Sequence, residues 1–123
     1  MALTTARMAA ALDEALKNVT HVFWSSNGST VSSSVAATAV TLNSATVANP
    51  SVVSNDGALE SAEATDPVTI THFAFGYFDD VTPVLETTWN ELDSPAVLLA
   101  GGKITVADEA LKEQLYQATE APE

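Results

Sequence analysis

The run Val68–Phe78 constrains the fold more than any other stretch of this chain. It reads VTITHFAFGYF, so that most of its residues are β-branched or aromatic, and Asp79-Asp80 closes it. Such residues are typical of β-strands. Apolar side chains occupy both odd and even positions of the run, and in a strand these positions point to opposite faces. The run therefore predicts a central strand that is covered on both faces.

Other strand signals recur at intervals of about ten residues, with turn residues between them. The expected strands are Val19–Trp24, Thr38–Thr46, Ala58–Ala64, Val84–Trp89, Ala96–Ala100 and Lys103–Val106. Asn27-Gly28 is a type I′ turn signal, and Asn55-Asp56-Gly57 marks another turn. No helical pattern separates these strands, which favours a mainly β fold, an antiparallel β-sandwich over residues 19–106, rather than a βαβ architecture.

Both ends of the chain carry weaker signals of helix. Residues 4–17 have apolar side chains at helical spacing, and Thr4 or Thr5 can cap the start of a short amphipathic helix. Residues 108–117 fit a helix or a strand, and local propensity favours the helix. We expect a loose tail at 118–123 and a single domain over residues 1–123.

Charge limits the partners of this chain. It has 123 residues with 4 Lys+Arg against 16 Asp+Glu, a formal charge of −12, and no cysteine. Nucleic acid and anionic membranes both need a positive protein surface, so neither is an expected partner. The absence of cysteine excludes disulfides, thiolate catalysis and Cys-ligated zinc. No run reaches the ~18 apolar residues that span a bilayer, and we expect a soluble chain with its natural start.

The charges are unevenly distributed along the chain. No Asp, Glu, Lys or Arg lies between Asn18 and Asn55, whereas fourteen of the sixteen acids follow from Asp56 onward. A segment rich in Ser and Thr can be a disordered linker. The valines spread through it favour strands instead.

Chemistry-bearing residues are few. His21 and His72 each lie in an expected strand, where a core or interface role is more typical than a metal site. The acidic pairs Asp79-Asp80, Glu91 with Asp93, and Asp108-Glu109 lack a Ca²⁺-loop pattern and fit solvated loops. There is no G-x-S-x-G, P-loop or G-x-G-x-x-G motif. We therefore expect no enzyme, no catalytic residue, no cofactor and no metal.

The order of features resembles a family of small structural proteins of tailed phages, especially those of actinobacterial hosts. The features are the opening Met-Ala-Leu-Thr, the helix with Ala-Leu-Asp-Glu-Ala-Leu, the Ser/Thr/Ala/Val-rich middle, Val-Thr-Ile-Thr-His-Phe-Ala-Phe and Gly-Gly-Lys-Ile-Thr-Val. Where the family has a Leu-His-Thr-like turn, this chain has Val22–Asn27. In the family, the segment corresponding to 108–117 is strand-like.

This resemblance implies a non-enzymatic virion protein made in the host cytoplasm. The first expectation is a capsid decoration or minor capsid protein on the capsid exterior, which binds the major capsid protein, copies of itself as a homo-oligomer, or both. The alternative is a minor tail protein that contacts the host surface or a glycan. The uncharged segment would make the contacts while the acidic half faces solvent. Tryptophan and other aromatic residues dominate interfaces, so the candidate contact residues are Phe23 and Trp24, Asn27 at the tip beside them, and Trp89.

Overall fold

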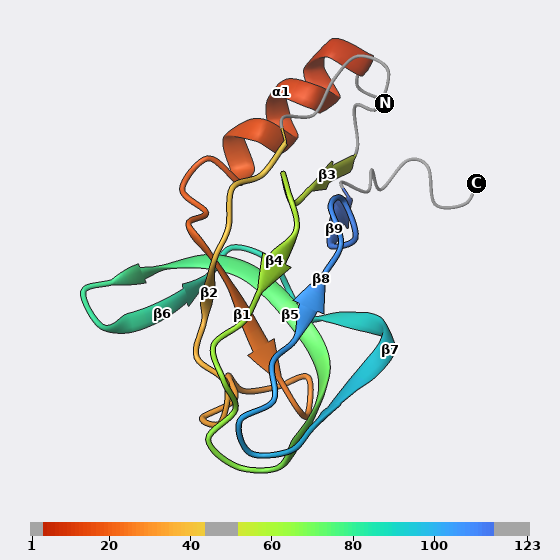
Figure 1. The fold of residues 1–123 in the computed structure, drawn as a ribbon. Helices are drawn as coiled ribbons and strands as arrows, with labels where there is room; N and C mark the ends of the chain where they lie inside the picture. Colours follow the sequence, from red (N-terminus) through yellow and green to blue (C-terminus); the bar gives the residue numbers. More distant parts are fainter. Residues whose placement is uncertain (1–3, 44–51, 115–123) are drawn as a thin grey trace.

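The computed structural model describes residues 4–43 and 52–114, and these form one helix and nine strands that pair only in antiparallel fashion (Figure 1). The helix is α1 (Thr5–Ala15). The strands are β1 (His21–Ser25), β2 (Thr38–Ala39), β3 (Val52–Ser54), β4 (Leu59–Glu60), β5 (Val68–Asp79), β6 (Thr82–Leu85), β7 (Asn90–Leu98), β8 (Thr105–Val106) and β9 (Lys112–Gln114). This confirms the predicted mainly β fold with a short N-terminal helix.

The strand β5 is central, as the sequence predicts. β1 lies along one edge of it, from Ser25 opposite His72 to His21 opposite Gly76. The other edge pairs first with β7 and then with β6, and β2 extends the sheet beyond β1. The result is a five-stranded sheet, accompanied by the two-stranded ladders β3–β9 and β4–β8.

The main core lies between this sheet and the β4–β8 ladder. Side chains from β1, β5 and β7 meet Val106 of β8 and Ile104 just before it. The buried members of this cluster are Val22, Trp24, Val35, Val40, Ala64, Ile70, Phe73, Phe75, Leu98, Ile104, Val106 and Leu111. Four of these residues, Val22, Trp24, Val35 and Val40, come from the charge-free segment, so its described part packs into the fold and contributes strands β1, β2 and β3 rather than forming a free linker.

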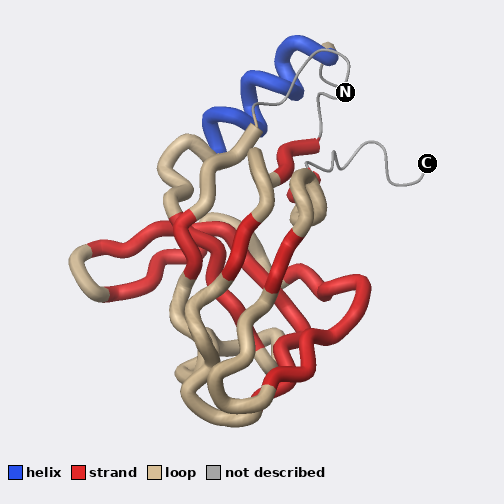
Figure 2. The backbone as a smooth tube through the Cα atoms, viewed as in Figure 1, coloured by secondary structure: helices blue, strands red, loops and turns tan. Residues whose placement is uncertain are grey.

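The helix α1 forms a second, smaller core at one end of the molecule (Figure 2). Thr4 caps it, because its Oγ1 accepts a hydrogen bond of 3.3 Å from the Arg7 N–H. Leu12 and Leu16 lie on one face and pack against Val53 of β3. The amphipathic helix predicted at 4–17 is thus confirmed, with its last turn ending two residues early.

Two turn and strand predictions need correction. Gly28 has φ +73°, but Asn27 does not have the positive φ that a type I′ turn requires. Instead, Ser25 Oγ accepts the Gly28 N–H at 2.9 Å, and a long loop follows before β2. The strand expected at Val84–Trp89 begins earlier, at Thr82, and ends at Leu85. Proline is tolerated there because β6 is an edge strand.

The C-terminal helix expected from local propensity is wrong for residues 108–114. These residues form a turn followed by β9, which pairs with β3 from Ser54 opposite Lys112 to Val52 opposite Gln114. Pairing with a distant strand overrides a weak local preference. Residues 115–117 and the tail expected at 118–123 lie outside the described residues.

Candidate functional site

Two of the four predicted contact residues belong to the core rather than to a surface. Phe23 and Trp24 are both 0% exposed, on opposite faces of β1. Trp24 faces the main core and donates a hydrogen bond of 3.0 Å from Nε1 to Thr38 Oγ1. In this fold neither side chain has surface to offer a partner, which corrects the expectation that they make contacts.

The other two candidates reach the surface in different places. Asn27 is exposed, but its Oδ1 accepts the N–H groups of Ser29 and Thr30 at 2.8 and 3.0 Å, so the side chain shapes its own loop. Trp89 is half-buried just before β7. Its neighbour Asn90 pairs with one edge of β5 while β1 pairs with the other, so β5 separates Trp89 from the β1 residues.

The two histidines do not share a site. His21 stands opposite Gly76 and His72 opposite Ser25, which places them about 13 Å apart along the strands. Each ring Nδ1 lies close to the hydroxyl of the preceding threonine, at 2.8 Å from Thr20 Oγ1 and 2.7 Å from Thr71 Oγ1 respectively. Both rings therefore have structural partners.

Acidic side chains are equally scattered. Asp79 and Asp80 lie at the β5–β6 turn, Glu91 and Asp93 on β7, and Asp108 and Glu109 on the turn before β9, and all are exposed. Within residues 4–43 and 52–114, no group of three or more His, Asp or Glu side chains is placed to hold a metal ion.

The hairpin of β5 and β6 projects from the body of the molecule (Figure 1). Exposed apolar side chains lie at its tip. We call the segment Phe78–Pro83 the hairpin tip. Phe78 is 39% exposed and Val81 is 80% exposed. The turn is two residues long, with Asp79 opposite Thr82, and Asp80 has φ +61°. Positive φ at this first central position is typical of a type II′ turn.

Close packing at the base makes this hairpin rigid. Phe78 contacts the rings of His21 and Phe23, with centroids 5.0 and 5.2 Å apart, both edge to face. A Cβ at Gly76 would overlap the carbonyl oxygen of Val84 across the hairpin, so the two strands approach each other where only glycine fits. Phe78 therefore lies against β1 with part of its ring exposed, whereas Val81 is turned to solvent.

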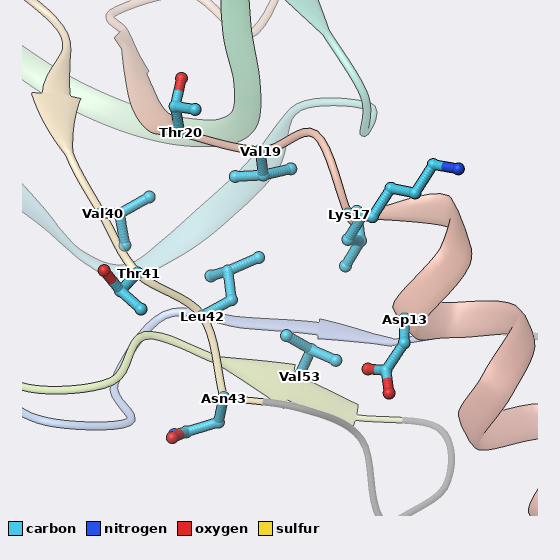
Figure 3. Close-up of a pocket in the computed structure, with 10 residues that line it drawn as sticks. Asp13, Lys17, Val19, Thr20, Val40, Thr41, Leu42, Asn43 and Val53 are labelled. Carbon is cyan, nitrogen blue, oxygen red and sulfur yellow. The ribbon is translucent and has the colours of Figure 1, made fainter.

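A pocket of about 560 Å³ lies between α1, β3 and the segment after β2 (Figure 3). Its walls are about equally aliphatic, with Leu16, Val19 and Leu42, and polar, with Asp13 and Lys17 among the polar residues. Lys17 extends away from these walls, and its hydrogen bond and charge attraction to Glu14 raise the pKa of the ammonium group. The pocket is a packing hollow beside the small core, without a buried acid or base in its walls.

No protein-family model, curated protein or solved structure matches this chain. No helix in the described part of the chain is both long and apolar enough to cross a bilayer. The surface geometry is therefore the main guide to function.

The sequence interpretation did not single out Phe78 and Val81 as contact residues. Asp79-Asp80 predicts that the strand closes there, and in the structure β5 ends at Asp79. An apolar Val81 inside a charged turn was the available signal, because an apolar side chain at a turn has little chance of burial within its own chain.

Proposed function

We propose that this chain is a non-enzymatic structural protein of a tailed-phage virion. It binds the assembled major capsid lattice from the outside, as a decoration protein. The observation that supports this proposal is the projecting hairpin tip, which presents Val81 and part of the Phe78 ring to solvent while Phe78 packs against β1. The resemblance of the sequence to small phage structural proteins is the reason for proposing a phage virion as the particle.

The proposed architecture is an antiparallel β-sandwich. What supports it is the shared core, to which β1, β5 and β7 contribute from one sheet and Val106 and Leu59 from the β4–β8 ladder. A layered β subunit with a protruding hairpin suits adhesion, because the layers keep the hairpin in a fixed position while it inserts between neighbouring subunits.

Adhesion in this proposal comes from many weak, identical contacts. A subunit that binds the assembled lattice and not its free building blocks stabilises the lattice by mass action. The net charge of −12 favours a basic or neutral surface on the capsid side, or contact through the apolar hairpin tip. Copies of the same chain can meet at lattice symmetry axes, which makes a homo-oligomer on the particle part of the proposal.

Location on the particle is the first test. Gold-labelled antibody against this chain is applied to intact virions of the phage that encodes it, and the particles are viewed by electron microscopy. We expect label over the heads. Label confined to tails would replace the decoration role with that of a minor tail protein, and unlabelled particles would overturn a place in the virion.

The hairpin tip gives a second, quantitative test. Val81→Ser removes an exposed apolar side chain that makes no core contact, so the fold should be unaffected. We expect the affinity of the Val81→Ser variant for purified capsids that lack this protein to be about tenfold lower than that of the parent, as for the loss of an interface anchor. Co-sedimentation with increasing protein concentration measures the change.

The matched control is Leu99→Ser, because Leu99 is 76% exposed against 80% for Val81 but lies after β7, outside the hairpin. We expect its affinity to stay within about twofold of the parent. Equal losses in the two variants would show that the hairpin tip is not the contact.

A further inference from the structure

Asn27 is the only asparagine of the sequence that glycine follows, and the proposed function does not use this pair. Asn-Gly is the dipeptide most prone to spontaneous deamidation, because a glycine without Cβ lets its backbone nitrogen approach the asparagine side chain. The structure places the pair in the loop after β1, where Asn27 is exposed and Gly28 is half-buried. Water therefore reaches a dipeptide that deamidates in a free chain.

Deamidation at this pair is a ring closure followed by hydrolysis. The Gly28 backbone nitrogen attacks Asn27 Cγ and loses its proton, so that a nitrogen–carbon bond forms, the Cγ–Nδ2 bond breaks and ammonia leaves. Water then opens the succinimide at either carbonyl, which gives aspartate or isoaspartate. Ring closure requires a Gly28 nitrogen that is free to react and an Asn27 side chain that can turn its Cγ toward it.

One buried hydroxyl holds both reacting groups. Ser25 ends β1 opposite His72 and is 0% exposed. Its Oγ accepts the Gly28 N–H at 2.9 Å and donates to Asn27 Oδ1 at 3.0 Å. The nucleophile and the electrophile of the ring closure are thus bonded to the same oxygen atom, which the pairing of β1 with β5 keeps in place.

The Asn27 side chain has further partners within the loop. Oδ1 also accepts the N–H groups of Ser29 and Thr30 at 2.8 and 3.0 Å, and Nδ2 donates to Thr30 Oγ1 at 3.1 Å. Gly28 lies against the ring of His72, since a Cβ at Gly28 would be 3.0 Å from it. Rotation of the Asn27 amide breaks these hydrogen bonds, so ring closure has to wait until the loop opens.

We propose that Asn27 is a latent deamidation site, which the Ser25 hydroxyl protects while the loop is closed. The rate in the folded chain is then the rate of the free sequence multiplied by the fraction of chains with an open loop. Deamidation would add a carboxylate between Asn18 and Asn55, where the chain otherwise has no charged side chain. This site follows from the loop alone and holds whether or not the chain belongs to a virion.

The first test compares the full chain with a free, end-capped peptide that has the sequence of residues 25–30. Both are kept at neutral pH and the same temperature, and mass spectrometry of proteolytic fragments follows the conversion of Asn27 to aspartate and isoaspartate. We expect the peptide to deamidate at least about tenfold faster than the full chain. Equal rates would show that the closed loop gives no protection.

Ser25→Ala removes the oxygen that holds both reacting groups. We expect Asn27 to deamidate at least about tenfold faster in this variant than in the parent. The matched control is Ser61→Ala, because Ser61 is also buried and its Oγ accepts a backbone N–H, that of Ile104, at 2.8 Å, outside the loop. We expect its rate of deamidation at Asn27 to stay within about twofold of the parent.

Thr30→Val tests the same loop without a change in the core. Thr30 is exposed, and the substitution removes the acceptor for Asn27 Nδ2 while its own N–H still reaches Oδ1. We expect deamidation about threefold faster than in the parent, since one hydrogen bond of the side chain is lost. This variant tests the loop even if Ser25→Ala does not fold, which circular dichroism will report.

Three further outcomes would overturn the protection by Ser25. Unchanged deamidation in Ser25→Ala would show that its hydroxyl does not control the site. Slower deamidation in Ser25→Ala would show that the hydroxyl passes the Gly28 proton to Asn27 Oδ1 and so promotes the reaction. Equal acceleration in Ser25→Ala and Ser61→Ala would show that global unfolding, rather than opening of the loop, exposes Asn27.

Discussion

Replacing Trp24 with alanine is expected to lower the free energy of unfolding by about 3 to 5 kcal/mol, the usual cost of truncating a buried aromatic side chain. Trp24 is the largest fully buried side chain in the described chain, and it lies in the main core. A domain of this size is stable by only about 5 to 15 kcal/mol. The variant should therefore be largely or partly unfolded at 37 °C, as urea titration followed by circular dichroism will report.

Two further variants separate the contributions of Trp24. Thr38→Val removes the acceptor for the indole N–H but keeps the ring, and we expect a loss of about 1 to 2 kcal/mol. Trp89→Ala removes the half-buried tryptophan, and we expect a smaller loss than for Trp24→Ala. If Trp24→Ala and Trp89→Ala lower the free energy of unfolding equally, the assignment of Trp24 to the core is wrong.

The strand and helix signals that succeeded are local ones. Most residues of Val68–Phe78 are β-branched or aromatic, and the structure has β5 from Val68 to Asp79. The helix α1 likewise follows from its own apolar spacing and its Thr4 cap. Such elements are predictable because the residues that determine them are neighbours in sequence.

The role of β1 was not predictable in the same way. Alternation along a strand places Phe23 and Trp24 on opposite faces, but it does not reveal whether each face is covered. Phe23 is covered because Phe78 and Gly76 come from a strand about fifty residues later in the chain. From the sequence alone, a bulky aromatic residue such as Phe23 is therefore easily mistaken for a contact residue on the surface.

The candidate contact surfaces depend on long-range pairing as well. The apolar run Ala96–Ala100 predicts a strand, and β7 includes Ala96–Leu98. Its departure from β5 follows from a register shift between Ile70 and His72 that no local pattern encodes.

Asn55 illustrates the same limit, because the sequence marks it only as part of a turn. In the structure it is fully buried and connects its own turn, at Gly57, to the distant segment 107–111. Its Nδ2 donates to the carbonyl oxygens of Gly57 and Ala107 at 2.7 and 3.1 Å, and its Oδ1 accepts the Leu111 N–H at 2.9 Å. One side chain thus holds the turn after β8 against the end of β3.

Asn55→Ala is expected to lower the free energy of unfolding by about 3 kcal/mol, because it removes three hydrogen bonds and leaves buried backbone groups without partners. The Leu111 amide loses its acceptor inside the core, so its hydrogen exchange should accelerate more than that of amides in β1. Urea titration gives the global loss, and exchange measured by NMR gives the local one.

Asn43→Ala is the matched control for Asn55→Ala. Asn43 is half-buried, and its Nδ2 makes longer hydrogen bonds, of 3.3 and 3.4 Å, to Ser54 Oγ and the Asn55 carbonyl. We expect this variant to lose about 1 kcal/mol or less. Equal losses in the two variants, or unchanged exchange at Leu111, would contradict the role given to Asn55. A larger loss of unfolding free energy for Asn55→Ala would support a role of Asn55 in the turn at residues 108–111. The Asn55 side chain bonds the Ala107 carbonyl and the Leu111 N–H, and these bonds stabilise a turn there in place of the helix that local propensity favours.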